Sequence, residues 1–321
     1  MQLKKLLLLT AGIMAAASVH AQATWPAQPI KLVVGYSPGG PVDTSARTFA
    51  KYLSDELKQS VVVENRTGAS GMIAAESVSR ATPDGYTLNF VASPTLTITP
   101  IVQKKPMDHD KDFSYIGNIV DYTNVLVVNN DVPVKSVQEL VEYAKKNPNA
   151  VTFGSAGVGA SNHLSAELLK QKTGTEMLHV PYRGNSPAMV DVIGGKITFM
   201  FDITSTAKNY IDSGKVRALA VTSRERNAGL PDVPSMIEAG VDDYAVTGWY
   251  ALIGPAELPA DVVNRLHDAL KSITSNADFV KNMKNGGYTI DLSDGEELKA
   301  RVKREYAMWD EVIEKGNILK K

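Results

Sequence analysis

Two glycine-rich segments of this chain carry the residue types that bind an anion through backbone amides. The first covers residues 35–43 (GYSPGGPVD) and the second covers residues 154–163 (GSAGVGASNH); each follows a β-branched run and precedes a helical run. Glycine permits positive φ and close approach of a ligand, and a helix start presents unpaired N–H groups with about half a positive charge. Together the segments predict a site that binds one carboxylate from two sides without an arginine.

The pattern around these segments is typical of an α/β fold. Short β-rich runs alternate with amphipathic helical runs, which predicts mostly parallel sheets. Strands are expected at residues 30–34, 61–64, 87–91, 115–120, 125–129, 151–154, 177–180, 197–201, 216–221 and 250–253. Helices are expected between them, including 137–147 after Ser136, 261–274 and 293–316. Roughly 300 residues exceed one typical hydrophobic core, so we expect two domains.

The first 23 residues have the three-part layout of a secretory signal peptide. Lys4 and Lys5 precede an apolar run over residues 6–17, and small residues follow up to Ala23. The apolar run is shorter than the roughly 20 residues that cross a bilayer, and no later run is long and apolar enough to do so. We therefore expect residues 1–23 to be a signal peptide and the mature chain to be a soluble periplasmic protein without a lipid anchor.

Composition excludes several classes of function. Removal of Lys4 and Lys5 leaves 32 basic and 35 acidic residues, a formal charge of −3, so the mature chain has no footprint for nucleic acid. The chain has no cysteine, which excludes disulfides, thiolate metal sites and a cysteine nucleophile. His163 and His179 have neither a second histidine at metal spacing nor an obvious nucleophile beside them. We therefore expect no metal, no cofactor and no catalytic residue.

Seven motifs occur in order over nearly the whole mature chain. They cover residues 36–47 (YSPGGPVDTSAR), 64–71 (ENRTGASG), 154–164, 180–184 (VPYRG), 201–202 (FD), 230–234 (LPDVP) and 248–250 (GWY). This series resembles that of the Bug receptors, the periplasmic solute-binding subunits of tripartite tricarboxylate transporters. The resemblance implies a type II periplasmic-binding-protein fold, in which two α/β domains flank a ligand cleft and the chain crosses twice. It places one domain at residues 24–117 and 249–321 and the other at residues 118–248.

The resemblance also implies which residues hold the ligand. A carboxylate would lie between the two glycine-rich segments, partly through ordered waters. The implied contacts are Tyr36, Ser37, Gly39, Gly40 and Asp43 on one side and Ser155, Ala156, Gly157, Gly159, Ser161 and His163 on the other. Asn65 and Ser70 would line the wall. Tyr182, Asn185 and Asp202 come from strand ends, where ligands of open α/β sheets usually lie.

Some of these assignments have an alternative. Asn185 and Asp202 are also typical of residues that only shape a loop or turn. Arg183 stands where lysine is more usual in the family, and it either reaches a second acidic group of the ligand or pairs on the surface. The identity of the ligand therefore stays open.

The predicted function is capture of a small carboxylate, such as a di- or tricarboxylate, an acidic amino acid or an aromatic acid. The receptor would close by a hinge motion at the two crossover strands and present the ligand to a membrane permease. By resemblance we expect a monomer. Two other functions stay open: a sensor receptor that signals to a membrane kinase, and a periplasmic hydrolase or lyase that uses Ser161 or His163.

Overall fold

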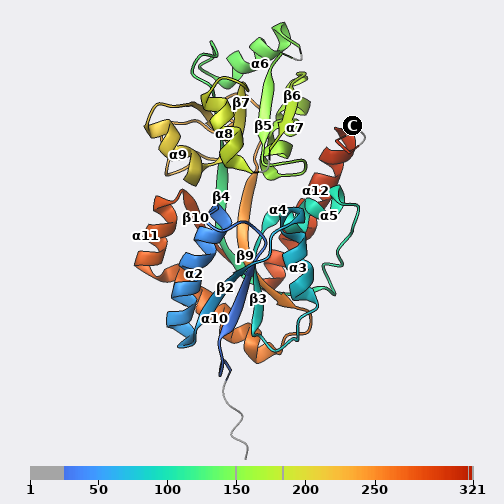
Figure 1. The fold of residues 1–321 in the computed structure, drawn as a ribbon, viewed down its shortest axis with the longest axis vertical. Coiled ribbons are helices and arrows are strands. Elements are labelled where there is room, and N and C mark those ends of the chain that lie inside the picture. The colour runs from blue at the N-terminus through green and yellow to red at the C-terminus, as the bar shows by residue number, and fades with distance from the viewer. Residues whose placement is uncertain (1–24, 149, 183, 317, 320–321) are drawn as a thin grey trace, which may run out of the picture.

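The computed structural model describes residues 25–148, 150–182, 184–316 and 318–319. The predicted signal peptide lies outside these residues, and so does Arg183. The described chain forms two lobes, one below the other in Figure 1, which are joined by long central strands. Each lobe has its own cluster of buried apolar side chains. The predicted α/β fold with two lobes is confirmed.

The first lobe is built on a parallel strand pairing. Its central strand β1 (Ile30–Val34) pairs with β2 (Val61–Asn65) on one side and β3 (Thr87–Ala92) on the other. Its helices are α2 (Pro41–Leu57), α3 (Met72–Ser79), the short α4 (Ser93–Thr97) and α5 (Thr99–Val102), α10 (Ala260–Ser275) and α11 (Ala277–Asn285), with a 3-10 turn at Ala69–Gly71. Since β1 runs directly into the first glycine-rich segment, the sheet places that segment at its carboxyl edge.

The second lobe repeats this arrangement. Its central strand β5 (Thr152–Ser155) pairs in parallel with β6 (Leu178–Pro181) and β7 (Phe199–Ile203). Its other elements are α6 (Val137–Lys146), α7 (Ser161–Thr173), α8 (Asn185–Ile193), α9 (Thr204–Asp212) and β8 (Arg217–Val221). The predicted N-cap of α6 is confirmed, because the Ser136 side chain accepts a hydrogen bond from the Glu139 amide. The carboxyl end of β5 carries the second glycine-rich segment.

Two strands join the lobes. They are β4 (Phe113–Val128), which has sixteen residues, and β9 (Thr247–Pro255), and they pair with each other antiparallel. β4 also pairs antiparallel with β10 (Tyr288–Asp294), β7 and β8, so the whole sheet is mixed and its parallel pairs lie inside the lobes. The predicted strands 115–120 and 125–129 are one strand, and β10 and α11 were not predicted. The polar residues 121–124 lay between the two predicted strands, and in the structure β4 passes from one lobe to the other at these residues.

The last long helix packs against both lobes. α12 (Gly295–Lys315) begins with a capping box formed by Asp294 and Glu297 and runs up the side of the molecule in Figure 1. Leu298 lies in an apolar cluster of the first lobe, whereas Trp309 and Ile313 lie in the cluster of the second lobe. The helix predicted at residues 293–316 is therefore present and buries one side against both lobes. The predicted domain boundaries fall inside β4 and β9, and they stay a prediction.

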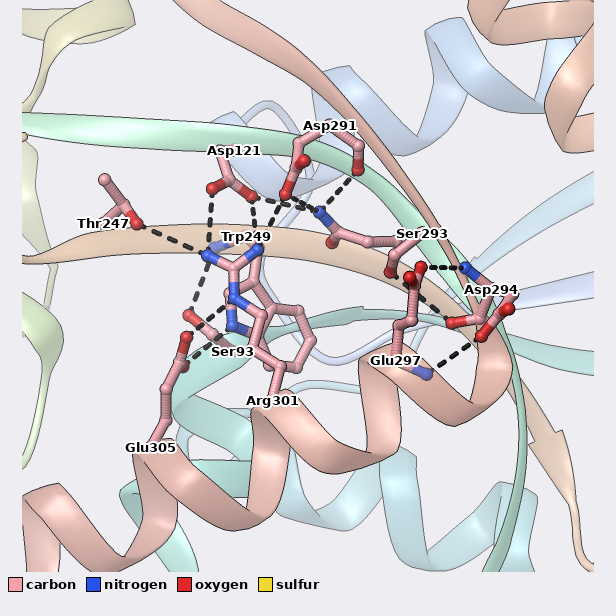
Figure 2. A network of polar contacts seen from close by, with 11 residues as sticks. Ser93, Asp121, Thr247, Trp249, Asp291, Ser293, Asp294, Glu297, Arg301 and Glu305 are labelled. Carbon is pink, nitrogen blue, oxygen red and sulfur yellow. Dashed lines mark hydrogen bonds and ion pairs between the residues drawn. The ribbon is translucent and has the colours of Figure 1, made fainter.

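A polar network ties α12 to the two crossover strands (Figure 2). The Arg301 guanidinium pairs with Asp121 on β4 at 2.9 Å, with Asp291 on β10 at 2.9 Å and with Glu305 at 2.8 Å. Trp249 of β9 is paired with Asp121 of β4, and its indole N–H donates a hydrogen bond to the Glu305 carboxylate at 2.8 Å. Burial raises the pKa of the Asp121 and Glu305 carboxyl groups, although the pairing with Arg301 opposes this. The crossover is therefore held by a largely buried group of charges.

Candidate ligand-binding cleft

A cavity of about 1160 Å³ lies between the two lobes. The first lobe contributes residues 35–42, residues 67–70, Ala92 and Pro94, and the crossover strands contribute Tyr122 and Tyr250. The second lobe contributes Ala156, residues 160–162, residues 184–187, Met189, Asp202, Ile203, Ser205, Thr206, Asn209, Tyr210, Ser213 and Lys215. Both glycine-rich segments thus reach the same cavity from opposite lobes.

Nine of the sixteen predicted ligand-binding residues line this cavity. They are Tyr36, Ser37, Gly39, Gly40, Ser70, Ala156, Ser161, Asn185 and Asp202. The other seven are not among its lining residues: Asp43, Asn65, Ser155, Gly157, Gly159, His163 and Tyr182. All seven make hydrogen bonds within or to the two glycine-rich segments, Tyr182 through its backbone amide, which donates to the Ser155 carbonyl at 3.0 Å.

In the first lobe, Asp43 and Asn65 hold the glycine-rich segment in place. Asp43 accepts hydrogen bonds from the Gly39 amide at 2.8 Å and from the Arg47 guanidinium at 2.9 Å. Asn65 donates to Asp43 at 2.8 Å and to the Tyr36 carbonyl at 3.0 Å. Burial disfavours the charged carboxylate, but the hydrogen bonds from Arg47, Gly39 and Asn65 hold the pKa of Asp43 below its usual range. Asp43 is therefore an ionised support behind the cleft wall.

In the second lobe, the amides of the glycine turn are used internally. The Ala156 amide donates to Asn162 Oδ1, the Gly157 amide to Ser155 Oγ and the Gly159 amide to His163 Nδ1, at 3.1–3.2 Å. These three amides thus already have acceptors among side chains of the same segment, and their contact with a carboxylate stays a prediction. What the segment still presents to the cavity is the start of α7.

Among the described residues, four helices of nine or more residues begin at the cavity without a capping side chain. They are α2, α7, α8 and α9, whose N-caps are Gly40, Ala160, Gly184 and Ile203. Away from the cavity, α6, α11 and α12 are each capped by the side chain at their own start, whereas α10 is not. The first amides of a helix have no acceptor inside the helix. The four starts therefore bring positive potential and N–H groups to one cavity, although Pro41 of α2 has no N–H and the His163 amide of α7 already donates to Asn162 Oδ1.

Behind the second segment, two histidines stack on each other. The ring centroids of His163 and His179 are 3.8 Å apart, and His179 Nε2 lies 2.6 Å from Ser155 Oγ. Burial lowers the pKa of His179 to about 4, so this imidazole is neutral at physiological pH. Ser155 is fully buried and does not line the cavity. The pair supports the loop and is not placed to attack a bound acid.

A third loop, predicted only in part, also lines the cleft. Residues 67–70 lie in the cavity wall, and φ is +129° at Gly68, +45° at Ala69 and +49° at Ser70. The Ser70 carbonyl accepts hydrogen bonds from the Tyr36 hydroxyl at 3.1 Å and from Thr95 at 2.9 Å. Only Ser70 of this stretch was predicted. The unusual feature of this loop is positive φ at the non-glycine residues Ala69 and Ser70, and this cannot be read from the sequence.

The first and third loops touch through two glycines, which leads to a test. A Cβ added at Gly35 would lie 2.4 Å from the Gly71 Cα, so Gly35→Ala must push the loops apart. We expect a loss of about 1–3 kcal/mol in unfolding free energy from overpacking, and at least a tenfold weaker ligand affinity, measured by calorimetry. Gly174→Ala is the control, because Gly174 lies in the open at the end of α7, where an added Cβ meets no neighbour and only the positive φ of 62° is strained. An unchanged affinity in Gly35→Ala would show that this loop contact does not shape the cleft.

The crossover strands contribute two tyrosines that sequence reasoning did not assign. Tyr122 and Tyr250 line the cavity, and their ring centroids lie 4.9 Å apart. Tyr122 lies directly over Gly248, where an added Cβ would meet its ring at 1.9 Å. The motif 248–250 carried the resemblance without indicating this contact. The sequence contains the glycine and the tyrosine, but only the pairing of β4 with β9 shows that Gly248 lies opposite Tyr122.

Among the described residues, no group of three or more His, Cys, Asp or Glu side chains is placed to bind a metal ion. In the same ranges, no helix combines the length and apolar composition needed to cross a bilayer.

Comparison with known proteins agrees with this architecture. A family model described as the tripartite tricarboxylate transporter family receptor matches residues 45–318. Protein BugT of Bordetella pertussis is 31% identical over 309 residues, which cover 95% of this chain and 93% of BugT. An R. palustris protein solved with adipate has a TM-score of 0.85 at 31% identity and covers 91% of this chain and 98% of its own.

A further solved structure has the same fold. MatC from Rhodopseudomonas palustris with bound malate is similar to this chain with a TM-score of 0.80 at 27% identity, over 90% of this chain and all of MatC. These solved proteins cover the two lobes and the crossover strands together. On this evidence the chain belongs to the tripartite tricarboxylate transporter receptors, the family of the Bug solute-binding proteins.

Proposed function

We propose that this protein captures a small carboxylate in its interlobe cleft and delivers it to a membrane permease of the tripartite tricarboxylate type. The family consists of periplasmic solute-binding receptors, so the chain is a receptor and not an enzyme. The observation that carries the choice of ligand is the set of four uncapped helix starts around the cleft. Adipate and malate in two related structures support the same class of ligand.

The cleft wall has few charged side chains, which favours binding of a carboxylate by neutral hydrogen-bond donors. Among the described lining residues, Asp202 and Lys215 are the only acidic and basic side chains. A bound carboxylate would therefore accept hydrogen bonds mainly from free amides and from hydroxyls such as those of Ser37 and Ser161. Each such bond to a charged group contributes about 1.5–3 kcal/mol. Three or four suffice for micromolar affinity, which is about 8 kcal/mol, after the entropic costs.

A thermal-shift and calorimetry screen tests the proposed ligand class. The panel contains adipate, malate, glutamate, benzoate and butanoate, with glucose and putrescine as uncharged and cationic controls. A ligand at about 100 times its Kd stabilises the folded protein by about 2.7 kcal/mol, which is readily seen as a rise in melting temperature. We expect at least one acid to bind and both controls to fail. Binding of glucose or putrescine with no response to any acid would overturn the proposal.

Export and delivery are the finer parts of the proposal. We infer that residues 1–23 direct export and are removed, which mass spectrometry of the protein recovered from the periplasm would test. Delivery to a permease is distinguished from sensing by uptake of the labelled acid in cells. Loss of uptake on deletion of this receptor supports transport, whereas unchanged uptake with a lost transcriptional response supports the sensor alternative.

A further inference from the structure

One acidic side chain stands among the helix starts of the second lobe. Asp202, at the end of β7, lines the cleft, and only 1% of its surface is exposed. The proposed function requires a second negative charge, that of the ligand, in the same cavity. Two carboxylates in one poorly solvated space cannot both keep their charge at ordinary pH without a large free-energy penalty.

Asp202 is also one end of a chain of side chains that connects three helix starts. Asn185, the first residue of α8, donates its amide to Asp202 Oδ1, and Thr206 in the first turn of α9 donates to Oδ2 at 2.8 Å. The Asn185 carbonyl oxygen accepts from Asn162 at 3.2 Å, and Asn162 in the first turn of α7 accepts from the Ala156 amide. This carboxyl group therefore aligns the starts of α7, α8 and α9.

The groups around this carboxyl are all neutral. Its partners are the Asn185 amide from α8, the Ile203 backbone amide at 2.9 Å and the Thr206 hydroxyl from α9. The residue paired with it on β4 is Val125. In the described part of the chain it makes no ion pair, and the other titratable side chains in the cleft wall are Tyr36, Tyr122, Tyr210, Tyr250 and Lys215. No tyrosine or lysine changes charge between pH 5 and 8 at its ordinary pKa.

We propose that Asp202 is the positioning residue of the second-lobe helix starts, and that binding of an acid in the cleft is coupled to uptake of a proton by its carboxylate. This inference rests on the proposed function. The proton adds to one carboxylate oxygen and no covalent bond breaks. The protonated group still accepts from its neighbours and no longer repels the ligand.

The direction of the pH dependence follows from the burial of this group. Burial raises the pKa of Asp202 to about 6 in the empty cleft, although its three hydrogen bonds oppose the shift. A nearby ligand carboxylate raises this pKa further, because like charges disfavour ionisation. Between pH 6 and 8 the bound state therefore holds more protons than the free state, and ligand affinity must increase as the pH falls. The ligand does not take up this proton, since its own carboxyl pKa is about 4–5.

Calorimetry in two buffers of different ionisation enthalpy measures the proton directly. The probe is the tightest binder from the panel of adipate, malate, glutamate, benzoate and butanoate. At pH 7 we expect uptake of roughly 0.5–0.9 proton per bound acid, and an affinity that weakens about tenfold or more from pH 6 to pH 8. In Asp202→Asn, which retains the size and polarity of the side chain, both the uptake and the pH dependence should disappear.

Two control variants separate titration of Asp202 from a purely structural role. Thr206→Val removes one donor to the carboxylate and should shift the pH dependence to higher pH. Asp212→Asn removes an exposed carboxylate at the end of α9, outside the cleft wall, and should leave the proton uptake unchanged. Uptake near zero in the wild type, or equal uptake in Asp202→Asn, would overturn this inference while acid binding itself stands. If no acid binds, the proposed function fails first.

Discussion

Ala160→Asp is expected to stabilise the empty protein and to abolish capture of carboxylates. Ala160 is the N-cap of α7, its backbone is extended with φ −67° and ψ 153°, and it lines the cleft. An aspartate there can accept a hydrogen bond from the first amides of α7 and place its negative charge at the positive end of the helix. N-capping contributes about 0.5–2 kcal/mol to stability. The same carboxylate would occupy the space proposed for the ligand.

The measurement combines melting temperature with affinity. We expect a rise of a few degrees in the melting temperature of the empty protein, together with at least a hundredfold loss of affinity for the acids that bind the wild type. Ala160→Ser is the matched control, because serine caps the helix without a charge; we expect similar stabilisation and a much smaller loss of affinity. An aspartate variant that binds acids normally would show that the start of α7 does not hold the ligand.

Arg301→Met should destabilise the protein more than loss of any exposed ion pair. Arg301 is 18% exposed and pairs with Asp121 and Glu305, which are each 19% exposed. Its removal leaves two largely buried carboxylates without their cation at the crossover of β4 and β9. Breaking a buried pair in this way costs about 3–5 kcal/mol. Chemical denaturation at pH 8 measures the loss of unfolding free energy. Both lobes should be destabilised, because α12 packs against both.

The pH dependence distinguishes lost charge pairing from lost packing. Burial already raises the pKa of Asp121 and Glu305, and without Arg301 it rises further. When a carboxyl group has a raised pKa in the folded state, the protein becomes less stable as the pH rises through that pKa. The loss of unfolding free energy in Arg301→Met should therefore shrink from pH 8 to pH 5. Arg226→Met, which removes an exposed pair with Glu238, is the control and should lose under about 1 kcal/mol. A deficit in Arg301→Met that is small or independent of pH would contradict this account.

Much of the fold was predictable because it depends on local pattern. The buried strand β1 is a short run rich in β-branched residues, and the helix after Ser136 carries its start signal in four consecutive residues. Where a strand was misjudged, the cause was tertiary. Asp121, in the polar stretch 121–124 of β4, pairs with Arg301, which lies 180 positions later in the chain, and no local rule anticipates such a partner.

The candidate site divides in the same way. The sequence by itself determined that two glycine-rich turns lead into helices and that the chain resembles an exported receptor, since these features involve residues close together in the chain. Only the tertiary structure decided which amides are free. Asn162 and His163 take the turn amides of the second segment, whereas α8 and α9 bring additional uncapped starts to the cleft. The physical reason is that a hydrogen-bond donor is available to a ligand only when no neighbour in space has already accepted from it.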